Sequence, residues 1–116
     1  MKASRLLTRQ LIKTRHFLRN NMEYILFIHN NTDSPTTEGQ WDSFFEDANK
    51  SGIFIGGSEI SNQMQVGNKA VKDITNEIVG YMRFESDDKS KILTLLEKHP
   101  VIIQGGTVEL CETPRT

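Results

Sequence analysis

The sequence has little of the chemistry that metal sites and disulfide frameworks require. Of its 116 residues, one is cysteine and three are histidine. The single Cys111 excludes an intrachain disulfide, and the histidines lie too far from it and from one another for a zinc-ligand spacing. We therefore expect no metal ion, and a reducing, cytoplasmic location for the protein.

Long apolar runs and phosphate-binding loops are also missing. The uninterrupted apolar run at residues 25–28 falls far short of the roughly 20 residues that span a bilayer. The glycines at 52, 56 and 57 lack the GxGxxG order of a dinucleotide loop, and no lysine follows a glycine-rich turn as in a P-loop. We expect no membrane span and no nucleotide cofactor.

Acidic residues are absent from residues 1–21, which hold six basic ones, so residues 22–116 carry a net charge of −7. An acidic body argues against nucleic-acid binding, which needs a basic face. The apolar residues of the N-terminal extension fall on one arc of a helical wheel. Three interpretations stay open: packing on the body or a partner subunit, targeting or membrane contact, and an extension upstream of a start at Met22.

Residues 22–116 predict one domain in which strands and helices alternate. Residues 23–29 are rich in β-branched and aromatic types and are apolar on both faces, which predicts a strand buried on both sides. Helices would cover one side and a second subunit the other. A domain of this size gains stability from a partner, so we expect a homodimer.

A first helix is predicted from the capping box of Thr37 and Gln40 to the C-terminal cap Gly52. Its apolar positions are expected to be core, with Trp41 near enough to the preceding loop to reach a pocket; they are Trp41, Phe44, Phe45 and Ala48. A second strand opens at residue 53. Residues 64–71 predict a projecting hairpin, or flap, with Gly67 and Asn68 at its turn.

The last third predicts strand, helix, glycine turn and strand. Residues 79–85 alternate, so Tyr81, Arg83 and Glu85 face away from the helices. A helix then runs from residue 86 or 87 to His99, with Ile92, Leu93, Leu95 and Leu96 buried and His99 ending it before Pro100. Residues 107–111 form the last strand. The order is βαββαβ, an α+β arrangement of the ferredoxin-like type with a flap.

With Gly80-Tyr81 in the third strand and Gly105-Gly106-Thr107-Val108-Glu109 at the last, residues 22–112 resemble the YCII-related (DGPF-domain-like) family. The resemblance implies a dimeric α/β barrel and metal-independent lyase or isomerase chemistry. The Asp-Gly-Pro-Phe segment of one branch is absent. Gln40 stands where another branch carries a histidine, and a neutral amide cannot move a proton.

Two groups of residues are candidate site residues. Tyr81 and Arg83, together with Trp41 and Gln40, would line a cleft for a small anionic or aromatic molecule, since a guanidinium matches a carboxylate. The alternative for Arg83 is a structural ion pair with Glu85, Glu109 or the other subunit. His29 beside Asp33 would be the catalytic acid/base pair, and the alternative is a surface histidine at a strand end.

These observations lead to two functional hypotheses. The first is a homodimer that binds an unidentified small molecule and, as an enzyme, would act as a lyase or isomerase. The second is a non-catalytic interaction or regulatory module in which the basic residues 1–21 dock a partner.

Overall fold

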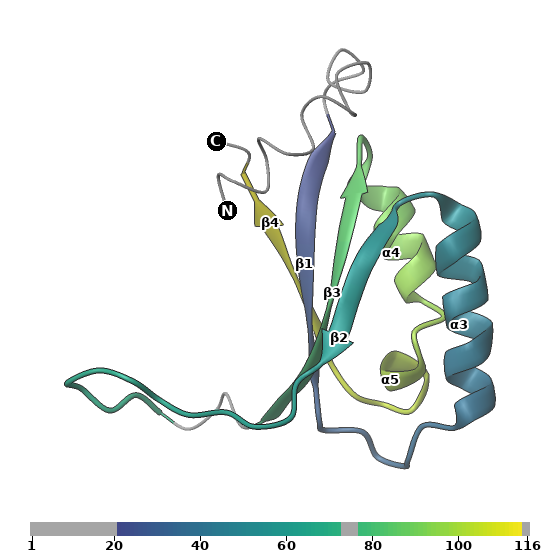
Figure 1. Cartoon of the computed structure of the whole chain (residues 1–116). Helices are drawn as coiled ribbons and strands as arrows, with labels where there is room; N and C mark the ends of the chain where they lie inside the picture. Colours follow the sequence, from purple (N-terminus) through teal and green to yellow (C-terminus); the bar gives the residue numbers. More distant parts are fainter. Residues whose placement is uncertain (1–20, 73–76, 115–116) are drawn as a thin grey trace.

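A computed structural model describes residues 21–72 and 77–114, which form four strands and three helices around one sheet (Figure 1). Labelled as in Figure 1, they are β1 (Met22–His29), α3 (Glu38–Ser51), β2 (Phe54–Glu59), β3 (Ile78–Ser86), α4 (Lys89–Leu96), α5 (Pro100–Ile103) and β4 (Val108–Thr113). The sheet order is β2-β3-β1-β4 and each neighbouring pair is antiparallel. The fold is therefore α+β, as expected.

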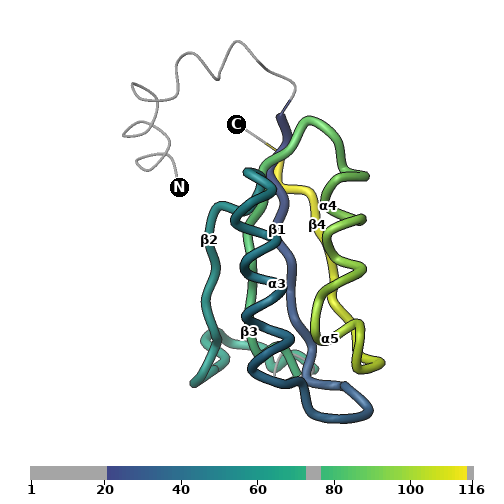
Figure 2. The backbone as a smooth tube through the Cα atoms, turned by 90° about the vertical axis from the view of Figure 1, so that its right-hand side faces the viewer, coloured from purple at the N-terminus to yellow at the C-terminus, as the bar shows by residue number. Residues whose placement is uncertain are grey.

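All three helices lie on one side of the sheet (Figures 1 and 2). The core forms between them: Tyr24, Leu26 and Ile28 of β1 are buried against Phe44 of α3 and Ile92 of α4. Ile25 and Phe27, which alternate with the buried residues, are only half-buried. The helices therefore bury one face of this strand as expected, and burial of its other face by a second subunit stays a prediction.

Helix α3 begins and ends where its sequence signals predict. The Thr37 hydroxyl accepts from the backbone N–H of Gln40, and the Gln40 side chain accepts from the backbone N–H of Thr37, at 3.1 and 2.9 Å. Gly52 closes the helix in the left-handed conformation, with φ of 76°. Phe44 is core as expected, but Phe45 is 36% exposed and is not.

The second helical segment is broken where one helix was predicted. Asp88 caps α4, which ends at Leu96, and Pro100 then opens the separate short helix α5. His99 is the N-cap of α5 and is fully buried, so the prediction that it ends the preceding helix is wrong. Leu93, expected in the core, is 50% exposed because it lies on the outer side of α4.

The chain leaves the sheet after β2 in a long arm (Figure 1). Residues 60–72, the described part of this arm, contain no strand, so the predicted hairpin is absent there. The side chain of Gln65 bonds both the N–H and the C=O of Val71, each at 3.2 Å. One glutamine therefore holds the two limbs together in place of a strand ladder.

The predicted basic extension, residues 1–21, lies outside the described residues except for Asn21. Within the part of the chain that is described, helices are too short and too polar to cross a membrane.

Candidate functional site

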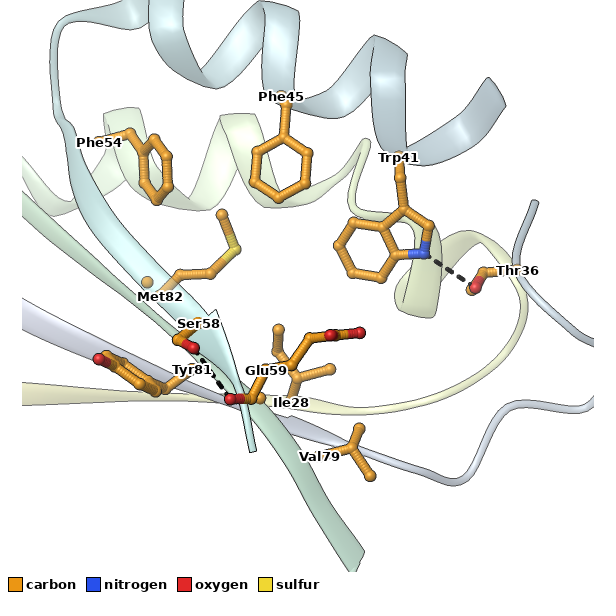
Figure 3. A pocket seen from close by; sticks show the side chains of 12 residues that line it. Ile28, Thr36, Trp41, Phe45, Phe54, Ser58, Glu59, Val79, Tyr81 and Met82 are labelled. Carbon is orange, nitrogen blue, oxygen red and sulfur yellow. Dashed lines mark hydrogen bonds between the residues drawn. The ribbon is translucent and has the colours of Figure 1, made fainter. Parts of the chain in front are cut away.

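A cavity of about 500 Å³ lies between α3 and the β2–β3 side of the sheet (Figure 3). Most of its wall is apolar, and the polar groups come from the loop before α3 and from β2. The lining residues are Ile28, Thr36, Trp41, Phe45, Phe54, Gly57, Ser58, Glu59, Val79, Gly80, Tyr81 and Met82. Cavities of this size and composition are typical of small-molecule sites.

Three aromatic rings form one side of the cavity in a continuous row (Figure 3). The rings of Trp41 and Phe45 are stacked with centroids 5.8 Å apart, and Phe45 contacts Phe54 at 6.0 Å. Trp41 and Phe45 are one helical turn apart on α3, so their rings project on the same side. The side chain of Met82 lies beneath them, and this flexible apolar side chain can adapt its packing.

Two of the side-chain hydrogen-bond donors in the cavity are occupied. The indole N–H of Trp41 donates to the Thr36 hydroxyl at 2.9 Å, and the Ser58 hydroxyl donates to the backbone carbonyl of Glu59 at 2.9 Å. The Glu59 side chain reaches toward Trp41 across the cavity (Figure 3). Its carboxylate supplies acceptors only. The polar part of the cavity therefore combines the acceptor-only carboxylate of Glu59 with the hydroxyls of Thr36 and Tyr81, which can donate or accept.

The position of Trp41 is held from two sides. The capping box orients the first turn of α3, and the Gln40 amide also donates to the Gln104 side chain at 3.3 Å. Gln104 in turn donates to the carbonyl of Pro35 at 3.1 Å. These bonds join α3, the loop before it and the turn after α5, so the wall that carries Trp41 is built from contacts distant in sequence.

Gly106, which lies shortly before β4, belongs to the turn after α5. A Cβ atom on Gly106 would lie 2.7 Å from Val101 Cγ1 and 2.9 Å from Asn31 Oδ1, so only glycine fits. The close approach lets the Asn31 amide bond both the N–H and the hydroxyl of Thr107, at 2.9 and 3.0 Å. The loop between β1 and α3 is therefore anchored to β4.

His99 lies behind the aromatic wall. Its ring contacts Trp41 and Phe44 edge-on, with centroids 5.1 and 4.8 Å apart. The Nδ1 atom accepts from the backbone N–H of Val101 at 3.1 Å, and Nε2 is buried without a hydrogen-bond partner among the described residues. Burial lowers the pKa of His99 from 6.5 to about 4, because the charged imidazolium would lose its water. The imidazole is therefore neutral at pH 7.

The structure separates the predicted ligand-binding residues. Trp41 lines the cavity. The side chain of Gln40 beside it is hydrogen-bonded to the backbone N–H of Thr37 in the helix cap and to the side chain of Gln104. Tyr81 lies at the margin with its ring pointing away from Trp41 (Figure 3). Arg83 does not line the cavity; its guanidinium lies 3.6 Å from the Glu23 carboxylate. The ion pair expected as the alternative for Arg83 thus exists, with a partner that was not predicted.

The described structure gives the imidazole of His29 a partner other than Asp33. His29 Nε2 lies 2.9 Å from Glu109 Oε1 of the neighbouring strand β4. Asp33 instead donates its backbone N–H to the carbonyl of Gln104 at 2.8 Å. Neither His29 nor Asp33 lines the cavity. His29 therefore has a carboxylate partner, which its position in the sequence could not identify.

Sequence reasoning missed Phe45, Phe54 and Glu59 as lining residues. The helical spacing of Phe45 predicts core, and the signal that it lines a cavity is its place one turn after Trp41. Phe54 and Glu59 belong to a strand whose glycines hide the alternation. Among the described residues, no group of three or more His, Cys, Asp or Glu side chains could hold a metal ion.

Comparison of the chain with known protein families finds no match, and comparison with characterised proteins finds none either.

Proposed function

We propose that this protein binds a small, largely apolar molecule with a flat ring in the cavity between α3 and the sheet. The observation that carries the proposal is the continuous row of Trp41, Phe45 and Phe54 along a cavity of about 500 Å³. Aromatic side chains gain most from flat apolar partners, and offset or edge contacts add to the burial of surface. Binding, and not proton transfer by His29 and Asp33, is the activity that this cavity supports.

The arrangement of the domain supports a ferredoxin-like protomer. The element order βαββαβ, the strand order β2-β3-β1-β4 and the antiparallel pairing agree with that fold. The same features agree with the resemblance to the YCII-related family. A shared fold does not specify an activity, so the function is argued from the cavity alone.

We further propose that two copies pair through the sheet face that the described helices leave open (Figure 1). Ile25 and Phe27 of β1 lie on this face, half-buried, opposite Cys111 of β4 and Tyr81 of β3. Half-buried β-branched and aromatic residues next to a polar margin suit a self-complementary interface. The paired sheets would form the α/β barrel that the resemblance implies.

Binding is tested with phenylbutanol, a neutral molecule that carries a phenyl ring on a short chain, by ligand-observed NMR on the full-length protein. Phe45→Ala removes the middle ring of the row at a position that is already 36% exposed, so the fold is expected to survive. We expect phenylbutanol to bind the natural protein and to lose most of its affinity for Phe45→Ala. The control Leu93→Ala removes another exposed apolar group, 50% exposed and away from the cavity, and should leave phenylbutanol binding unchanged. Equal binding to all three proteins would refute the proposal.

A further inference from the structure

The charged group in the cavity indicates which class of small molecule the cavity binds. This inference rests on the proposed function. Glu59 supplies the one acidic side chain of the lining, and no Lys, Arg, His or Asp belongs to it in the part of the chain that the structure describes. Among the described residues its carboxylate forms no ion pair or hydrogen bond. A carboxylate held beside an apolar wall without a cation is a group available to a ligand.

The hydrogen-bonding groups of the cavity also favour a positively charged ligand. The Trp41 N–H is held by the Thr36 hydroxyl and the Ser58 O–H by the Glu59 carbonyl, each at 2.9 Å, which leaves the hydroxyls of Thr36 and Tyr81 as the further side-chain donors among the described lining residues. An anionic ligand would need donors, and it would meet the repulsion of Glu59. A ligand with an ammonium group would satisfy the carboxylate and bring its own donors.

The aromatic row adds an attraction for a positive charge. The faces of indole and phenyl rings carry the negative part of their quadrupole, and Trp is the strongest side chain in this respect. Figure 3 shows the Glu59 side chain extending toward the indole of Trp41. A cation near the carboxylate would therefore also lie near the indole, with the apolar remainder of the ligand along Phe45 and Phe54.

We propose that the cavity selects small amphiphilic amines, in which an aromatic or aliphatic body fills the space along Trp41, Phe45 and Phe54 and a protonated amine pairs with Glu59. This proposal differs from the sequence-based expectation of an anionic ligand held by Arg83, since Arg83 does not line this cavity and its guanidinium lies 3.6 Å from the Glu23 carboxylate.

The test uses three probes with the same phenyl body and chain: phenylbutylamine, phenylbutanol and phenylbutyrate. Affinities are measured on the full-length protein through the fluorescence of Trp41, which is the only tryptophan in the chain. We expect the amine to bind about fivefold tighter than the alcohol, and the carboxylate to bind more weakly than either, in line with the worth of a partly exposed charge pair.

Two variants assign the preference to one carboxylate. Glu59→Gln keeps the shape of the side chain and should bring the amine and the alcohol to the same affinity. Glu97→Gln makes the same change at the end of α4, outside the cavity, and should preserve the fivefold preference.

The outcomes separate the two proposals. Equal affinity for amine and carboxylate, or a preference that survives Glu59→Gln, would overturn the amine inference while phenylbutanol binding leaves the proposed function in place. Failure of all three probes to bind would overturn both.

Discussion

The imidazole Nδ1 of His99 accepts a hydrogen bond from the backbone N–H of Val101, two residues later, at 3.1 Å. Because Nδ1 is the acceptor, the proton of the neutral ring lies on Nε2. In the part of the chain that the structure describes, this buried N–H has no hydrogen-bond partner, and the ring contacts Trp41 and Phe44. The helix cap of α5 and the back of the aromatic wall therefore depend on one neutral histidine.

The first prediction concerns pH. The folded-state pKa of His99 is lowered from 6.5 to about 4, so the unfolded chain takes up a proton there at a higher pH than the folded chain. The stabilisation from neutral His99 is present above pH 6.5 and is lost as the pH falls from there toward about 4. The total loss at this site is about 3 kcal/mol, at 1.36 kcal/mol per pKa unit.

Urea unfolding across this pH range measures the loss. In His99→Asn the side-chain oxygen can still cap α5 but the group no longer titrates, so the free energy of unfolding should fall less steeply with acid than in the natural protein. His29→Gln removes the other histidine of the described residues and should leave the steep fall in place. An identical pH slope in His99→Asn and the natural protein would contradict the buried neutral histidine.

The second prediction concerns the start of α3. Thr37→Ala removes the acceptor for the Gln40 N–H and should lower the free energy of unfolding by about 1 kcal/mol, whereas Thr37→Ser keeps the acceptor and should cost little. Chemical denaturation measures both. If alanine and serine cost the same, the methyl group and not the cap matters at this position.

The third prediction compares two glycines. A Cβ on Gly57 would run into the backbone carbonyl oxygen of Tyr81, so Gly57→Ala should destabilise the fold by roughly 2 kcal/mol. Gly39 lies in the first turn of α3 with nothing within 4 Å of its Cβ position, so Gly39→Ala should stabilise the protein by about 0.5 kcal/mol. Thermal or chemical unfolding of the two variants should shift in opposite directions. Stabilisation by Gly57→Ala would contradict the close β2–β3 contact, and destabilisation by Gly39→Ala would contradict the open space around its Cβ position.

The fourth prediction concerns the proposed dimer. Phe27→Asp places a charge at the centre of the open sheet face, opposite Tyr81 of β3, where a partner copy would have to bury it. Light scattering should report a dimer for the natural protein and a folded monomer for the variant. Leu93→Asp puts the same charge on an exposed position of α4 and should stay dimeric. A monomeric natural protein would overturn the barrel.

The elements that the sequence predicts well are those whose signals are local. Thr37, Gln40 and Gly52 bound α3 because caps satisfy the backbone groups of their own helix end. The alternation in β3 places Met82 and Phe84 in the core because successive strand residues face opposite sides.

The features that the sequence could not predict depend on contacts between distant segments. Pro100 ends one helix or begins another, and only the packing of His99 against Trp41 and Phe44 decides that it begins α5. The partner of His29 comes from β4, 80 residues away in the chain. The cavity likewise depends on how α3 packs against β2. Without that placement, the sequence does not distinguish Phe45, which lines the cavity, from a core residue.

The most direct test of the ligand cavity is heteronuclear NMR of the labelled full-length protein, titrated with phenylbutanol. We expect the largest shifts on the Trp41 indole N–H and on the backbone amides of Phe45, Gly57 and Gly80, which line the cavity. Shifts confined to Phe27 and Cys111 on the open sheet face, or to the arm of residues 60–72, would contradict it.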